Sequence, residues 1–238
     1  MTASAANTSG VVRDAAQLRY GAVFVVVLTQ LLFQVLAPDA SWARAVAVGL
    51  AAGALMVAVA TSRATSSVRR FRTVLVGLLA VIAVGGIASG AFSATVAFAI
   101  GTLFLAATPV VIVGALFRLT MKQGVTAQVV AGALAIYLLI GLLFASALNV
   151  AAHVEGGSFF SGSGTVTNGD RVYYSFTVLT TTGFGDYTTT RPVGHALAVL
   201  EMLTGQLYLV TVIGILIGNF AGRRIERGHS KPLSDRRE

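Results

Sequence analysis

The chain has 238 residues, of which 55% are hydrophobic and only 11% are charged, and its mean hydropathy is +0.81. A soluble domain carries about 25% charged residues, so this composition excludes an ordinary soluble enzyme, a disordered protein and a typical nucleic-acid-binding domain. It indicates an integral membrane protein instead. The chain has no cysteine, which excludes disulfides, thiolate metal sites and cysteine nucleophiles.

Six hydrophobic segments predict helices that cross the membrane, because such a helix needs about 20 mainly apolar residues. A glycine cluster at residues 85–90 predicts the break between the third and fourth helices, and Pro109 is expected to kink the fourth. The first helix is expected to be retained, since no small-residue signal-peptide cleavage site follows its apolar core. The predicted spans are residues 20–36, 43–60, 74–89, 95–117, 127–150 and 193–220.

Lysine and arginine are unevenly distributed between the predicted loops. With the N-terminus placed in the cytoplasm, all but three of the 17 lie on the cytoplasmic side, and the exceptions are Arg44, Arg171 and Arg191. This bias predicts a multi-pass protein of the cell membrane with both termini in the cytoplasm. The cytoplasmic arginines also predict contact with anionic lipid headgroups. No aromatic residues are interleaved with them, so no nucleic-acid partner is expected.

The segment between the fifth and sixth predicted spans is not a simple helix. Residues 156–170 are rich in glycine, serine and threonine and predict a solvated loop, with a turn at residues 168–169. Asp170 is expected to cap a short helix over residues 171–179. Two helical turns are too short to span a bilayer. A short helix at membrane depth is tolerated only where it is buried in protein or lines water.

The short helix is followed by residues 180–186, Thr-Thr-Thr-Gly-Phe-Gly-Asp, which we call the Thr-Gly run. Its two glycines alternate with larger residues and allow backbone conformations of alternating hand. Successive carbonyl oxygens of such a strand can point the same way. A ring of these strands would form stacked oxygen cages that replace the water shell of a cation. The hydroxyl of Thr181 could add one more oxygen layer.

Residues 181–186, Thr-Thr-Gly-Phe-Gly-Asp, resemble the potassium-channel signature Thr-Val-Gly-Tyr-Gly-Asp, with a matching short helix before them and a membrane helix after them. The resemblance covers about residues 171–219. It implies an all-α membrane protein with six transmembrane helices and a re-entrant pore helix and selectivity filter between the fifth and sixth. It further implies a homotetramer, since one chain supplies one of four filter strands, and passive K⁺ conduction without enzymatic activity or cofactor.

The resemblance assigns roles within the run residue by residue. It makes Gly185 the end of the filter and Asp186 the acid at the outer mouth, although a solvated loop acid is the alternative for Asp186. The backbone carbonyls that would be the main K⁺ ligands are those of Thr181, Thr182, Gly183 and Phe184.

Three residues of the short helix resemble filter supports. Tyr173 and Tyr174 stand where the family carries aromatic residues that brace the filter from behind, although tyrosine also favours the membrane interface. Thr177 stands where some relatives carry a glutamate that pairs with the filter acid, and that pair cannot form here.

The last predicted helix contains further candidates. Gly205 resembles a hinge glycine, although a glycine in a membrane helix can equally serve close packing. Leu209, Ile213 and Ile217 share one face and could line a cavity with a hydrophobic constriction, or pack against other helices. Glu201 is an intramembrane carboxylate, which is by default a functional candidate, or it lies near the interface, bonded behind the filter.

Two departures from the family pattern leave alternatives open. Phe184 replaces the usual tyrosine and Thr182 the usual valine, so potassium selectivity is expected but a weakly selective cation channel is the alternative. A non-conducting regulatory subunit also remains open. A secondary transporter would need repeats with two broken helices, and only one re-entrant segment is found. No nucleophile–base pair suggests an enzyme.

The chain divides into four predicted parts. Because the fourth span carries no lysine or arginine over residues 95–117, and a sensor needs several charges in the field, no conventional voltage sensing is expected. No soluble regulatory domain is expected either. The parts are a cytoplasmic tail (1–19), a four-helix bundle in the sensor position (20–117), a pore domain (118–220) and a basic cytoplasmic tail (221–238).

Overall fold

The computed structural model describes residues 21–61, 66–123, 126–161 and 165–229. Within these residues the regular secondary structure is helical except for one pair of short strands, as expected for alanine- and leucine-rich apolar segments. In chain order the elements are the helix Gly21–Leu36, α2 (Ser41–Thr61), α3 (Ser66–Ala88), α4 (Ala94–Gln123), α5 (Ala127–Glu155), β1 (Phe160–Ser161), α6 (Asn168–Leu179), β2 (Thr188–Thr189) and α7 (Pro192–His229).

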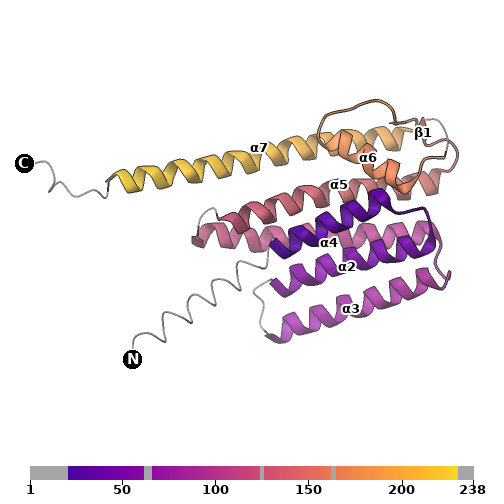
Figure 1. The fold of residues 1–238 in the computed structure, drawn as a ribbon, viewed down its shortest axis with the longest axis horizontal. Helices are drawn as coiled ribbons and strands as arrows, with labels where there is room; N and C mark the ends of the chain where they lie inside the picture. The colour runs from indigo at the N-terminus through magenta and orange to yellow at the C-terminus, as the bar shows by residue number, and fades with distance from the viewer. Residues whose placement is uncertain (1–20, 62–65, 124–125, 162–164, 230–238) are drawn as a thin grey trace, which may run out of the picture.

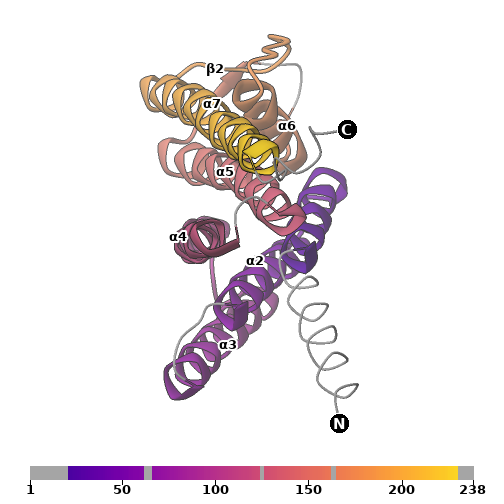
Figure 2. The same ribbon diagram turned by 90° about the vertical axis from the view of Figure 1, so that its left-hand side faces the viewer.

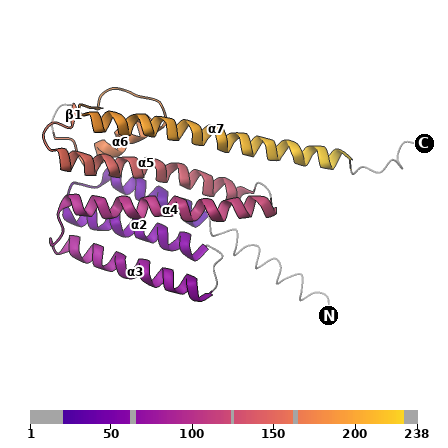
Figure 3. The same ribbon diagram turned by 180° about the vertical axis from the view of Figure 1, so that it is seen from behind.

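The long helices lie side by side along one common direction (Figures 1 and 3). Seen along that direction, α5, α6 and α7 form one group, which we call the C-terminal half (Figure 2). The helix Gly21–Leu36, α2, α3 and α4 form the N-terminal bundle, and α4 joins the two by packing on both α2 and α5. The short α6 packs on α5 and α7 near one end of the assembly, and α7 extends past the other helices at the opposite end (Figure 1).

Five helices of the described chain are long and apolar enough to cross a membrane, and they correspond to five of the six predicted spans. The described part of the first predicted span, Gly21–Leu36, is apolar but shorter. The segments with the required length and hydropathy are Ser41–Ala60, Arg70–Ala88, Ala94–Gly114, Gln128–Glu155 and Pro192–Val212.

Helix α3 shows the membrane character most clearly. Only 11% of its apolar window is buried within the chain, and Phe71, Val74, Leu78 and Val81 are exposed. A soluble monomer rarely exposes a contiguous apolar surface of this kind. These side chains are suited to contact lipid hydrocarbon.

Several predicted helix ends are wrong. Helix α3 begins at Ser66 and α4 continues to Gln123, because arginine and lysine are good helix formers and extend helices past their apolar cores. The predicted break at residues 85–90 lies at the end of that cluster, where Gly90 has a φ of +76°. Gly86 is inside α3, where a Cβ would lie 2.4 Å from a ring carbon of Phe92, so close packing explains this glycine.

Candidate functional site

The N-terminus of α6 is fixed by a capping box. Thr167 is the N-cap: its hydroxyl accepts the backbone N–H of Asp170 at 3.2 Å, and Asp170 accepts the backbone N–H of Thr167 at 2.8 Å. The prediction that Asp170 caps a helix beginning at Arg171 is therefore wrong, and the predicted turn at residues 168–169 is the first helical turn. The spacing of Thr167 and Asp170 was the sequence signal that identifies this cap.

Asp170 is also a hydrogen-bond acceptor for a tyrosine that follows the Thr-Gly run. Burial alone would raise the pKa of Asp170, but hydrogen bonds from Thr167 and Tyr187 and the nearby charge of Arg171 lower it below its ordinary value. The hydrogen bond to Asp170 raises the pKa of Tyr187. Asp170 is therefore ionised at neutral pH, where a carboxylate in the first helical turn is favourable.

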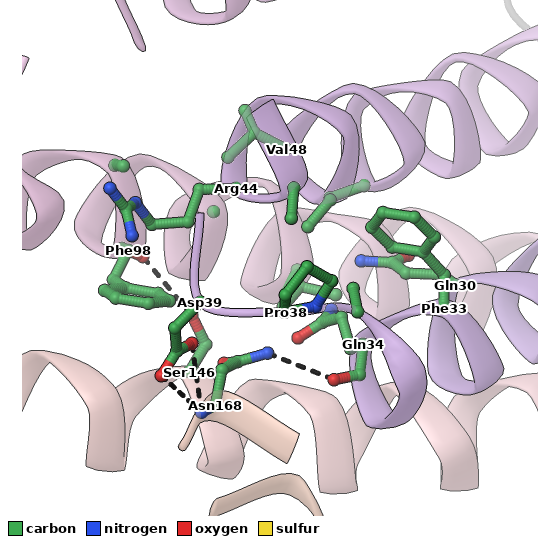
Figure 4. A pocket seen from close by; sticks show the side chains of 17 residues that line it. Gln30, Phe33, Gln34, Pro38, Asp39, Arg44, Val48, Phe98, Ser146 and Asn168 are labelled. Carbon is green, nitrogen blue, oxygen red and sulfur yellow. Dashed lines mark hydrogen bonds between the residues drawn. The ribbon is translucent and has the colours of Figure 1, made fainter. Parts of the chain in front are cut away.

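The same end of α6 is attached to the N-terminal bundle (Figure 4). The backbone N–H of Asn168 donates to the carboxylate of Asp39 at 3.1 Å, and the Asn168 side chain donates to the Gln34 carbonyl at 3.2 Å. On the other side, Asn149 of α5 donates to Asn168 at 2.9 Å and accepts from Arg171 at 2.8 Å. These bonds tie α6 to both halves of the chain.

A cavity of about 30 Å³ lies beside this attachment, between the helix Gly21–Leu36, α2, α4 and α5 (Figure 4). Gln30 lines it and is completely buried, and its side-chain oxygen and nitrogen have no hydrogen-bond partner among the described residues. Such a volume holds about two water molecules. It is too small for an organic ligand.

The predicted solvated loop over residues 156–170 is partly wrong. Phe160 and Ser161 form β1, which pairs antiparallel with Thr188 and Thr189 of β2. Phe160 is buried because its ring packs edge-on against the ring of Tyr174, with centroids 5.2 Å apart. The strand pair thus packs on α6 at Tyr174. Composition alone does not indicate this contact, because it joins segments that are distant in the sequence.

The Thr-Gly run leaves the C-terminal end of α6 with an unusual backbone. Positive φ angles occur at Thr181 (57°), Gly183 (53°) and Gly185 (79°). Thr182 and Phe184 lie between them and do not have a positive φ, so left-handed residues alternate with others along the run. The sequence predicted this freedom for the glycines but not for Thr181, since a non-glycine residue rarely adopts a positive φ. The backbone N–H groups of Thr182 and Gly183 both donate to the Thr177 carbonyl, at 2.9 and 3.1 Å.

The run is exposed along its whole length in the single chain. The hydroxyls of Thr180 and Thr182 lie 2.9 Å apart, and the side chain of Gln206 on α7 donates to the Thr181 hydroxyl at 3.3 Å. Among the described residues, no three His, Cys, Asp or Glu side chains cluster as a metal site.

Tyr173 and Tyr174 occupy different places. The Tyr173 ring stacks on Phe184, with centroids 6.2 Å apart and planes 3° apart, and its hydroxyl hydrogen-bonds to Asp186. Tyr174 instead contacts Phe160 of β1, away from the run. Tyr173 thus contacts two residues of the run.

Two glycines allow the C-terminal end of α6 to lie close to its neighbours. A Cβ at Gly205 of α7 would lie 2.7 Å from the Leu179 carbonyl oxygen, and a Cβ at Gly141 of α5 would lie 2.6 Å from a Phe176 ring carbon. Close packing therefore accounts for Gly205, and its hinge role stays a prediction. Gly141 was not identified from the sequence, because glycine is common in membrane helices.

The remaining predicted residues lie on α7. Glu201 is completely buried and contacts Ser175 of α6. Leu209 is half-buried, and the side chains of Ile213 and Ile217 lie outside the described part of the structure. The predicted cavity lining is therefore not tested.

One family model of known proteins matches part of the chain. A family model described as "Ion channel" matches residues 132–221, which include most of α5, all of α6, the Thr-Gly run and most of α7. No curated protein and no solved structure matches the chain. The match supports an ion channel in a membrane rather than an enzyme, and it falls on the part of the chain that carries the unusual backbone.

Proposed function

We propose that this chain is a subunit of a potassium-selective channel that conducts K⁺ passively through a filter built from the Thr-Gly run. The observation that carries the proposal is the series of left-handed positions at Thr181, Gly183 and Gly185, directly after the short helix α6. Alternation of this kind lets successive carbonyl oxygens point toward one axis. Carbonyl oxygens can replace the hydration shell of K⁺.

In this proposal the ion ligands are the carbonyls of Thr181, Thr182, Gly183 and Phe184, with Gly185 completing the filter. The C-terminal end of α6 carries partial negative charge and would favour a cation beneath the filter. Because the backbone of the run is anchored through the Thr177 carbonyl, the filter would be held from behind.

A closed cage of carbonyls needs several strands, and one chain supplies one. We therefore propose a homotetramer. The exposure of the run supports this assembly, as does an exposed apolar face on α7. Exposed apolar side chains that share this face of α7 include Leu200, Leu203, Leu207 and Val210.

The arrangement in the membrane follows from the charges. We propose six crossings, with the helix Gly21–Leu36 as the first and α6 as a re-entrant pore helix. Both termini would then lie on the cytoplasmic side of the cell membrane, with cytoplasmic arginines against anionic headgroups.

We also propose the division of the chain into a tail, a bundle, a pore domain and a second tail, with boundaries after residues 19, 117 and 220. Since α4 has no lysine or arginine before Arg118, the bundle is proposed as a scaffold without conventional voltage sensing.

A weakly selective cation channel is the second candidate, and Phe184 favours it. Its side chain is 68% exposed and has no hydroxyl to hydrogen-bond behind the filter. Within the chain it is held through the stack on Tyr173. A more deformable filter would discriminate less between K⁺ and Na⁺. A non-conducting regulatory subunit is the third candidate.

The test combines assembly and conduction. The mass of the detergent-solubilised protein is expected to correspond to four chains, and proteoliposomes loaded with K⁺ are expected to release it when a counter-ion pathway is opened. A monomer or dimer would contradict the assembly. A tetramer that releases no K⁺ at any voltage or pH would support the regulatory subunit instead.

A further inference from the structure

Glu201 is a buried carboxyl group that the proposed conduction pathway does not use. It lies on α7 with no exposed surface and faces the junction of α5 and α6. A buried charge without a partner is strongly unfavourable. The chemical state of this carboxyl group therefore depends on what surrounds it.

Three oxygen atoms from three helices lie in a row at this junction. The Ser175 hydroxyl oxygen is 2.7 Å from the Gly141 carbonyl oxygen and 2.5 Å from Oε1 of Glu201. Each of these short separations needs a hydrogen atom between the two oxygens, because otherwise their lone pairs would repel. A serine hydroxyl supplies one hydrogen and a backbone carbonyl supplies none.

The number of hydrogen atoms available for these two contacts decides whether Glu201 is protonated. If Ser175 donates to the Gly141 carbonyl, the second hydrogen must come from the carboxyl group of Glu201. If Ser175 donates to Glu201 instead, its oxygen is left against the Gly141 carbonyl with no hydrogen between them. Only the protonated acid therefore satisfies both short contacts.

Among the described residues, no lysine, arginine or histidine is bonded to Glu201 to stabilise its ionised form. Helix α5 has no lysine or arginine, and neither does α7 beside Glu201. The described basic side chains of α5, α6 and the first turn of α7 have other partners: Arg171 donates to Asn149, and ring nitrogens of His153 and His195 lie 2.7 and 2.6 Å from the carbonyls of Asn149 and Thr189.

Among the described residues, two tyrosines also lie near Glu201. Tyr137 of α5 and Tyr174 of α6 are close enough to interact with it electrostatically. Oε2 of Glu201 is buried and has no hydrogen-bond partner among the described residues. Leaving a neutral carboxyl oxygen unpaired costs less than leaving an anionic one unpaired.

We infer that Glu201 is a proton-binding site, occupied at neutral pH, and that the protonated acid connects α7 through Ser175 to Gly141 of α5. Ser175 lies two residues before Thr177, whose carbonyl anchors Thr182 and Gly183. Glu201 is thus a positioning residue: its proton holds α6 against α5 and α7, and α6 holds the run. The effect on conduction rests on the proposed function, whereas proton binding does not.

Infrared spectroscopy of the purified protein tests proton binding directly. At neutral pH the wild type is expected to show the C=O stretch of a protonated carboxylic acid, absent in Glu201→Gln and retained in the matched control Glu155→Gln, which changes an exposed glutamate. Ser175→Ala is expected to move this band to higher frequency because a hydrogen-bond partner is removed. A spectrum with only carboxylate bands, or a protonated band that survives in Glu201→Gln, would overturn the inference.

The pH dependence of cation flux tests the positioning role. Glu201→Gln is expected to conduct like the wild type at neutral pH, because the amide can donate to Ser175 as the acid does. Wild-type flux is expected to fall several-fold in alkali as the proton is lost, while Glu201→Gln flux stays constant. The same alkaline fall in both proteins would contradict the role. If neither protein conducts, the proposed function fails, and the infrared result still decides proton binding.

Discussion

In the N-terminal bundle, the described contacts of α2 are largely between apolar side chains, many of them small, whereas the helices of the C-terminal half add specific polar contacts to their apolar core. Helix α2 buries alanines that allow close approach of α3 and α4, among them Ala51, Ala54 and Ala58. Many sequences of small residues can pack in this way. The contacts of α2 with α3 and α4 therefore do not depend on one particular set of side chains.

The C-terminal half depends on particular atoms. The Tyr208 hydroxyl donates to the Ala133 carbonyl at 2.6 Å, and the Tyr208 ring stacks on Tyr137, with centroids 6.0 Å apart. Ser175 bonds to both neighbouring helices, and Gly141 and Gly205 admit α6 between them. The contacts that fix the position of a helix through particular atoms are therefore concentrated around α6, where the proposed filter begins. Substitutions there are expected to have the largest effects.

The largest effect is expected from Gly183→Ala or Gly185→Ala. Both positions have positive φ angles, where a side chain costs about 1–2 kcal/mol per residue. The carbonyls would turn away from the proposed axis, and K⁺ flux from proteoliposomes is expected to disappear while the protein stays helical and tetrameric. Gly53→Ala in α2, where nothing lies within 4 Å of the added carbon, is the matched control. Undiminished flux in both filter variants would remove the filter assignment.

A smaller effect on flux, but a clear one on stability, is expected from Gly205→Ala. The added methyl group would press on the Leu179 carbonyl, and overpacking of this kind typically costs about 1–3 kcal/mol. The measurement is the thermal or denaturant unfolding of the tetramer, again with Gly53→Ala as the control. Unchanged stability with altered opening would indicate instead that Gly205 acts as a hinge.

Asp186→Asn is expected to change conductance in a salt-dependent manner. An exposed carboxylate at the mouth of the proposed pore attracts cations, and the attraction reaches about 10 Å at 0.1 M salt and about 30 Å at 0.01 M. Single-channel conductance of the variant should therefore fall most at low ionic strength. Equal conductance of the two proteins in dilute salt would show that Asp186 is an ordinary loop acid.

The smallest effect is expected at the cap of α6. Thr167→Ala removes the capping hydroxyl and is expected to lower the free energy of unfolding by about 1 kcal/mol.

Because the pKa of Asp170 is lowered in the fold, the stabilising contribution of this carboxylate is complete above the ordinary aspartate range and is lost as the pH falls through the lowered value. Unfolding measured across acid pH should show this loss in the wild type but not in Asp170→Asn. A parallel acid profile in both would assign the loss to other carboxyl groups.

The sequence was most informative where a local pattern of residues determines the local structure. Long apolar runs identified the five long helices, and the glycines of the Thr-Gly run identified its backbone freedom. The strand pair β1–β2 was not predicted, since two-residue strands have no periodicity and the pairing of Phe160 with Thr189 joins distant segments. For Glu201 the sequence left open a bond behind the filter but did not identify Ser175 as the partner, because that residue comes from another helix. Gly141 was missed because glycine is common in membrane helices and its close neighbour Phe176 also lies on another helix.

The measurement that tests the proposed selectivity most directly is the reversal potential of the purified protein in a planar bilayer, with K⁺ on one side and Na⁺ on the other. A value close to the equilibrium potential of K⁺ is expected, since the carbonyls of the Thr-Gly run are proposed to replace the hydration shell of this ion. A clear current that reverses near zero would contradict potassium selectivity and support the weakly selective channel.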